Sequence, residues 1–130
     1  MKLNSAATYG LMAVAYTAQN QHKGLVRSND IADHYKIAVE FLLKVMQELV
    51  KANILRSKRG PHGGFSLARK PNQITMLEIL EAVQGPLTSN MLLTEQAPRE
   101  KFAAKAEKLS KQAFNEAGNV LKAVKLADLL

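Results

Sequence analysis

The sequence predicts a mainly α-helical protein with one small β-hairpin, arranged as a winged helix-turn-helix domain followed by a long C-terminal dimerisation helix. Three observations predict this fold. Two short helical segments joined by a brief turn occupy residues 28–52, and a glycine-tipped, cationic hairpin follows directly at residues 54–67. A long segment with helical apolar periodicity then fills most of residues 99–130. The expected units are therefore a domain over 1–85, a linker over 86–98, and a dimerisation helix with a tail over 99–130.

The first helix is expected to begin at Asn4 or Ser5, since either side chain can cap it, and to run to about Asn20. Apolar residues occur on nearly every face of this segment. A helix of that kind is buried on more than one side, so it should pack against its own domain and against something else.

The next two helices predict a helix-turn-helix. Ser28 is expected to cap a second helix of about Asn29–His34, and a tight connection leads to a third helix of about Val39–Ala52, which Asn53 can end in a left-handed conformation. The core stripe of the third helix has three- and four-residue spacing and consists of Leu42, Val45, Met46 and Leu49. Generic three-helix packing would give the same pattern, so the hairpin that follows decides between the two interpretations.

Two β-type runs, Ile54–Ser57 and Phe65–Leu67, flank a tip that is rich in glycine and proline at residues 60–64. No Asp or Glu occurs between Leu49 and Leu77. The cations in this window are Lys51, Arg56, Lys58, Arg59, Arg69 and Lys70. A basic hairpin with a small tip can lie against a phosphate backbone and insert into a groove, although an ordinary solvated hairpin would also carry exposed charges. Its position directly after two short helices is the winged-helix order and favours the first interpretation.

After the hairpin, Thr75 and Glu78 form a capping box at the start of a fourth helix, about Met76–Gln84, which Gly85 and Pro86 end. Residues 87–98 have no firm pattern and are interpreted as a linker.

The last helix is expected from about Arg99 to Lys122, with Gly118 permitting a close backbone approach. We expect its apolar stripe to pack against a second copy of the chain, since a complete small domain precedes it; folding back onto its own domain is the alternative. The tail, residues 125–130, is apolar enough to dock. The predicted dimerisation residues are Phe102, Ala106, Leu109, Ala113, Ala117, Val120 and Val124.

Composition narrows the function. The 130 residues carry a formal net charge of +7 with an isoelectric point near 9.8, which indicates an acidic partner, nucleic acid before membrane. No apolar run could span a bilayer, and the N-terminus does not look like a signal peptide, so a cytoplasmic protein is expected. The chain has no cysteine, which excludes disulfides and thiolate metal sites, and the three histidines lack ligand spacing. No catalytic grouping or phosphate-cradling loop stands out, so we do not expect an enzyme.

These residues resemble the Rrf-two (IscR-like) family of bacterial winged-helix transcription regulators, over almost the whole chain. The most specific part is the Arg-Gly-Pro-x-Gly-Gly-aromatic wing at Arg59–Phe65. The other matching segments are Tyr9-Gly10-Leu11, Ile31-Ala32, Phe41-Leu42, Ile74-Thr75, Ala82–Leu87 and Leu126–Leu130.

The resemblance implies a two-fold homodimer that binds double-stranded DNA, with the third helix in a major groove and the wing tip in an adjacent minor groove. It implies that the reading helix offers Ala38, Val39, Glu40, Leu43 and Lys44, and that the wing offers Lys58, Arg59 and His62. We expect an inverted-repeat operator and repression of transcription by blocking polymerase.

The residue types suggest separate roles within that interface. Arg59 suits a narrow, strongly negative minor groove, whereas Arg56, Lys58 and Lys44 suit phosphates. Ser28 could donate to a phosphate or act only as a helix cap. Glu40 could accept a hydrogen bond from a cytosine amino group, or it could only complement the helix dipole. Leu43 could contact a thymine methyl group, or it could only pack against its neighbours.

Three departures from the family pattern matter, and one is that Leu43 occupies a reading-helix position that is usually polar in the family. Many members bind an iron–sulfur cluster through three cysteines after the fourth helix, but residues 85–105 contain none, so no such cluster and no other cofactor is expected. The basic residues common early in the family's first helix are replaced by Ala6, Ala7 and Thr8. This loss mildly favours the alternative function, a winged-helix module that binds a partner enzyme rather than DNA. The two functions can also be combined: the chain could be a DNA-binding repressor that is controlled by a small molecule or a protein bound near residues 87–100.

Overall fold

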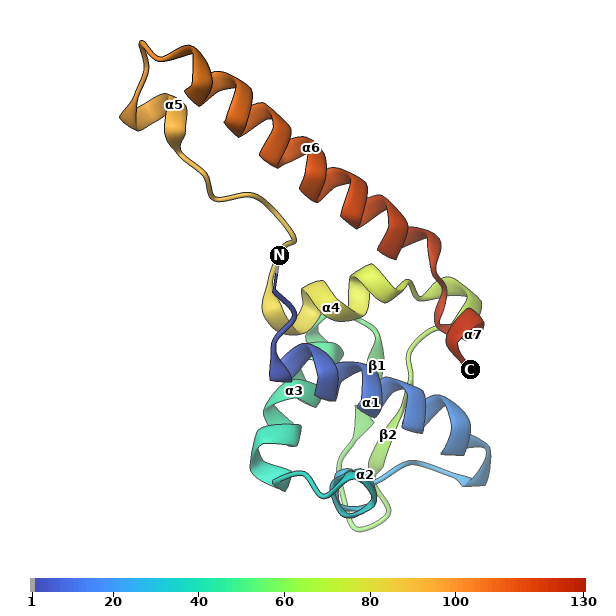
Figure 1. The fold of residues 1–130 in the computed structure, drawn as a ribbon. Helices are drawn as coiled ribbons and strands as arrows, with labels where there is room; N and C mark the ends of the chain where they lie inside the picture. Colours follow the sequence, from blue (N-terminus) through green and yellow to red (C-terminus); the bar gives the residue numbers. More distant parts are fainter. Residues whose placement is uncertain (1) are drawn as a thin grey trace.

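The computed structural model describes residues 2–130, and its elements follow the winged-helix order (Figure 1). The chain is mostly helical, with one two-stranded antiparallel sheet, and the long helix α6 extends from the N-terminal domain (Figure 1). The elements are α1 Ser5–Asn20, η1 Gln21–Lys23, α2 Ser28–Tyr35, α3 Val39–Lys51, β1 Leu55–Lys58, β2 Gly64–Leu67, η2 Pro71–Gln73, α4 Met76–Gln84, α5 Leu93–Gln96, α6 Lys101–Ala123 and α7 Leu126–Leu129.

The core of the domain lies where α1 packs against α3 and α4. The apolar stripe of α3 is buried there as predicted. Gly10 is buried in the middle of α1, and a Cβ atom at this position would lie 3.3 Å from both methyl groups of Val83 on α4. The glycine therefore allows the two helices to approach closely, which fits the expectation that α1 is buried on more than one side.

The helix ends confirm part of the sequence interpretation and correct part of it. Asn4 caps α1, because its side chain accepts a hydrogen bond from the Ala7 N–H at 3.0 Å. Ser28 does not cap α2: Arg27 occupies the capping position, Ser28 is the first helical residue, and no side chain satisfies this helix start. Asn53 has a φ of 59° and ends α3 in the left-handed conformation, as predicted; Lys36 plays the same role after α2.

The wing is a regular hairpin whose register pairs Leu55 with Leu67 and Lys58 with Gly64. Strand β1 begins one residue later than predicted, and strand β2 begins one residue earlier. The segment before α2 also joins the sheet, since Val26 and Phe65 exchange backbone hydrogen bonds of 2.9 and 2.7 Å. This pairing fixes the wing next to the start of α2.

The C-terminal part contains one element that the sequence did not indicate. Residues 87–98, interpreted as a plain linker, include the short helix α5, which packs against α6 (Figure 1). The capping box of Thr75 and Glu78 is present, and α4 has the predicted bounds. After α6 the chain returns to the domain, where Leu126 is only 1% exposed and its N–H donates to the Ile74 carbonyl at 2.8 Å. The tail is therefore docked through its backbone as well as through an apolar side chain.

Candidate nucleic-acid interface

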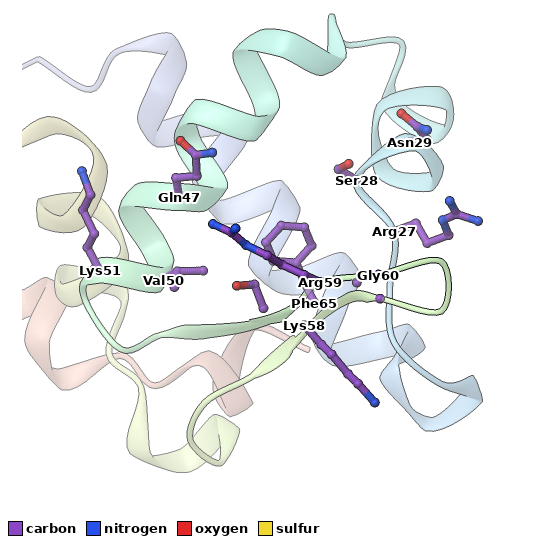
Figure 2. Close-up of a pocket in the computed structure, with 13 residues that line it drawn as sticks. Arg27, Ser28, Asn29, Gln47, Val50, Lys51, Lys58, Arg59, Gly60 and Phe65 are labelled. Atoms are coloured by element: carbon purple, nitrogen blue, oxygen red, sulfur yellow. The ribbon is translucent and has the colours of Figure 1, made fainter.

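A groove of about 590 Å³ lies between the wing, the first turn of α2 and the C-terminal half of α3 (Figure 2). Cationic and amide side chains line it together with the glycine backbone of the wing tip and the apolar side chains of Val50 and Phe65. The polar side chains that line it are Arg27, Ser28, Asn29, Gln47, Lys51, Ser57, Lys58 and Arg59. Cations and hydrogen-bond donors gathered around one open groove suit a polyanion.

The cations of the wing are free to contact a ligand. Arg56, Lys58 and Arg59 are exposed, and none of them takes part in an ion pair within residues 2–130. Arg59 points back toward α3, whereas Lys58 points away from it (Figure 2). The two neighbouring cations therefore face different sides of the hairpin.

Not all the cations between Leu49 and Leu77 are free, because two of them have partners within the chain. Lys51 pairs with Glu48 at 3.1 Å on the surface. Arg69 is held by its own chain, because its guanidinium donates to the carbonyls of Asn53 and Gln73 and to the Glu78 carboxylate. Arg69 is therefore a structural residue, whose role the sequence window did not reveal.

Only some of the residues of α3 that were predicted to contact DNA are exposed. Ala38, Glu40 and Lys44 are exposed, while Leu43 is half-buried. Val39 is also half-buried and packs against the core, so its side chain is less available than the resemblance implied.

Five polar residues that line the groove were not among the predicted site residues, namely Arg27, Asn29, Gln47, Lys51 and Ser57. Gln47 is exposed and lies one turn beyond Leu43 and two turns beyond Glu40, so helical periodicity alone could have identified it. Arg27 depends on the pairing of Val26 with the wing, for which the sequence gave no local signal. Ser28 does lie at the groove, although it is not a helix cap.

The backbone of the wing tip leaves no room for a side chain at Gly63. Gly63 donates its N–H to the Gly60 carbonyl at 2.9 Å, and a Cβ atom on Gly63 would overlap the carbonyl oxygen of Lys58. His62 and Pro61 are exposed at this tip. A narrow tip with an exposed imidazole can enter a groove that a bulkier loop could not.

The predicted dimerisation stripe of α6 remains largely uncovered. Phe102, Leu109 and Val120 are 56%, 63% and 67% exposed. The remaining members are exposed or half-buried, namely Ala106, Ala113, Ala117 and Val124. The side of α6 that packs on its own chain is different, with Ala103 buried and Phe114 and Leu121 half-buried.

Comparisons with known proteins bear on the fold and on the kind of protein. The family model Rrf2, described as an iron-dependent transcriptional regulator, matches residues 3–130. A protein of Aquifex aeolicus that is named as an HTH-type transcriptional regulator is 44% identical over 81 residues, which cover 62% of this chain and 56% of that protein. The chain spans about half the length of several of the curated relatives that it matches.

Two solved structures show the same fold over almost the whole chain. The structure of CymR, described as the global cysteine regulator of Bacillus subtilis, has a TM-score of 0.82 and 26% identity, and the match covers 99% of this chain and 95% of that one. The IscR of T. potens has a TM-score of 0.69 and 27% identity, with 99% and 85% covered.

The residues present do not fit a thiolate-bound iron–sulfur cluster. The chain has no cysteine, and residues 2–130 contain no group of three His, Asp or Glu side chains that could hold a metal ion. Within the same described range, no helix is both long and apolar enough to cross a membrane.

Proposed function

Because this chain belongs to the Rrf2 family of transcriptional regulators, we propose that it is a homodimeric repressor that binds an inverted-repeat operator in double-stranded DNA. The observation that carries the proposal is the groove between the wing, α2 and α3, where two amides and the cations Arg27, Lys58 and Arg59, unpaired within residues 2–130, adjoin the exposed face of α3. The family is one of regulators rather than enzymes.

In the proposed complex, α3 lies in a major groove and the wing tip enters the adjacent minor groove. Lys44 and Arg56 contact phosphates, which provide affinity without sequence choice. Glu40, Leu43 and Gln47 lie along the exposed part of α3 and reach base edges. The amide of Gln47 suits adenine, whose N6 and N7 atoms present one donor and one acceptor.

The wing supplies the second part of the contact. The Arg59 side chain points toward α3 (Figure 2), so in this proposal it swings outward on binding to reach the minor groove together with His62. A guanidinium is attracted to the negative potential of a narrow A·T-rich groove. Arg27 and Ser28, at the start of α2, contact the phosphates between the two grooves.

The dimer in this proposal forms through the exposed stripe of α6. Large apolar side chains such as Leu109 and Val120 lie on a helix that extends from the domain (Figure 1), and a second copy would remove them from water. A two-fold pair would present its reading helices about 34 Å apart, one turn of DNA, which requires an inverted repeat. A bound dimer would repress by excluding polymerase.

The test is selection of bound duplexes from random DNA, followed by affinity measurements over a range of salt. We expect an inverted repeat with half-sites about 10 base pairs apart, centre to centre. Affinity should fall by roughly 10³-fold or more between about 50 and 200 mM salt if six or more phosphates are contacted.

A matched pair of variants locates the contact. Arg59→Ala should weaken operator binding by about 1–3 kcal/mol if Arg59 reads a base edge. Lys111→Ala, which removes an exposed cation of α6, should leave it unchanged. Equal losses in the two variants would mean that net charge, and not the wing, governs binding. An absence of salt-dependent duplex binding would favour the protein-binding alternative.

A further inference from the structure

A second pocket, of about 390 Å³, lies between α4 and α6, where the winged-helix domain meets the long helix. Leu77 and Glu81 line it from α4, Phe114 and Lys122 from α6, and Leu87 from the segment between the two helices. This pocket is separate from the groove at the wing, with which it shares no residue.

The pocket combines three apolar side chains with two opposite charges. Leu77, Leu87 and Phe114 are half-buried. Glu81 accepts a hydrogen bond from the Leu87 N–H through Oε2 at 2.8 Å, which holds the carboxylate in place. Glu81 and Lys122 form no ion pair with each other, since the two salt bridges within residues 2–130 join other residues. Both charges are therefore available to a ligand.

Gly118 lines the pocket and places no side chain in it. A glycine inside a helix costs about 0.5–1 kcal/mol relative to alanine, so it calls for a local reason. The close backbone approach expected from the sequence is not that reason within this chain, because a Cβ atom on Gly118 would meet nothing within 4 Å. Gly118 also lies roughly 200° around α6 from Val120, at 100° per residue, and so faces away from the dimerisation stripe.

We propose that this pocket binds a small zwitterion with an apolar side chain, of the class of the free α-amino acids. The ammonium group would pair with Glu81 and the carboxylate with Lys122, while the side chain would pack on Leu77 and Phe114. An anion alone would face Glu81 and a cation alone would face Lys122, so a molecule that carries both charges is the best complement. Asn115 and Asn119, at the exposed edge of the pocket, add hydrogen-bonding capacity.

The position of the pocket gives such a ligand a regulatory effect; this part of the inference rests on the proposed function. The ligand would join α4 to α6, which are already connected at one end by the backbone pairing of Thr75 with Lys125. Because α6 sets the separation of the two reading helices in a dimer, a ligand that prefers one α4–α6 arrangement shifts operator affinity.

Binding is tested on the full chain without DNA, so that failure of this inference is distinct from failure of the proposed function. Thermal unfolding is followed with each of the twenty common L-amino acids at about 10 mM, since a ligand that binds only the folded state raises the melting temperature. We expect at least one apolar L-amino acid to do so and to give a saturable calorimetric titration. No increase with any of them would overturn the proposal.

Variants then place the site. Lys122→Ala removes the carboxylate partner, Glu81→Gln removes the charge that faces the ammonium, and Gly118→Leu fills the pocket. Each should abolish the increase in melting temperature. Lys111→Ala and Ala104→Leu make the matched changes at exposed positions of α6 outside the pocket and should preserve it. An increase that persists in Lys122→Ala and Glu81→Gln would overturn the assignment even if Gly118→Leu did not fold.

Operator affinity with and without the amino acid tests the regulatory part. We expect saturating ligand to change the affinity of the native chain by 5-fold or more, since allosteric coupling is typically about 5–150-fold. The same ligand should leave the Lys122→Ala variant unaffected. Identical affinities for the native chain in the two conditions would overturn the regulatory role.

Discussion

Arg69 donates a hydrogen bond from Nη1 to Oε1 of Glu78 at 3.0 Å, and its guanidinium also donates to the Asn53 and Gln73 carbonyls at 3.0 and 2.9 Å. Glu78 in turn accepts from the Thr75 N–H at 2.8 Å. The end of α3, the segment after the wing and the start of α4 are therefore held by one guanidinium. The backbone pairing of Thr75 with Lys125 extends this connection to the end of α6.

Arg69→Ala should lower the free energy of unfolding by about 1–3 kcal/mol, because it removes three hydrogen bonds, one of them to a carboxylate. Urea denaturation measures this loss. Arg56→Ala is the matched control, since Arg56 is exposed and makes no ion pair within residues 2–130; its effect on stability should stay within about 0.5 kcal/mol. DNA affinity should show the opposite order, with the larger direct loss in Arg56→Ala. Equal stabilities of the two variants would remove Arg69 from this structural role.

Glu78 should make stability depend on acid pH. Partial burial acts to raise the pKa of Glu78, but the hydrogen bonds from Thr75 and Arg69 and the charge of Arg69 outweigh it and hold the pKa below its ordinary value of 4.5. A carboxyl group whose pKa is lowered in the folded state contributes stability above its unfolded pKa and loses it as the pH falls through the folded pKa.

The comparison of native chain and Glu78→Gln measures this contribution. Between about pH 6 and pH 3, the urea midpoint of the native chain should fall more steeply than that of the variant. Parallel pH profiles would show that Glu78 contributes no pH-dependent stability.

Gly63→Ala should disrupt the wing without unfolding the domain. The added Cβ atom would overlap the Lys58 carbonyl oxygen, so the tip must rearrange, while the buried core of α1, α3 and α4 is untouched. We expect operator affinity to fall at least 10-fold, by loss of the wing contacts, and the circular dichroism spectrum to keep its helical signal. Pro61→Ala, at an exposed position of the same tip, is the control and should bind nearly as the native chain does. Native affinity in Gly63→Ala would mean that the wing does not contribute.

Leu109→Asp should convert a dimer to a monomer. Leu109 is 63% exposed, so the change costs little within one chain, but it would place a carboxylate in the apolar interface of the proposed dimer. Sedimentation equilibrium gives the mass directly. Lys108→Asp, an adjacent exposed residue on a different face of α6, should remain dimeric. A monomeric native chain would contradict the assignment of the stripe.

Local patterns made much of this fold predictable. The capping box of Thr75 and Glu78 lies within four residues, and the left-handed Asn53 follows from its own side chain, so neither depends on the rest of the chain. The stripe of α3 repeats with the helical period and is buried as expected.

What the sequence did not reveal depends on contacts between distant segments. Arg27 reaches the groove because Val26 pairs with Phe65, and Arg69 is a structural residue because Asn53, Gln73 and Glu78 converge on it. The prediction of Ser28 as a cap failed for the same reason. Serine is a favourable capping residue, but the pairing of Val26 with the distant Phe65 fixes the preceding backbone, and Arg27 takes the capping position. Short α5 has no apolar period of its own and packs on α6.

The most direct test of the account is the stoichiometry and affinity of binding to a selected inverted repeat and to one isolated half-site, measured at the same salt concentration. We expect two chains on each inverted-repeat duplex, bound at least 100-fold more tightly than the half-site, because linking two binding units through α6 raises affinity without any new contact. One chain per duplex, with equal affinity for the whole repeat and the half-site, would contradict it.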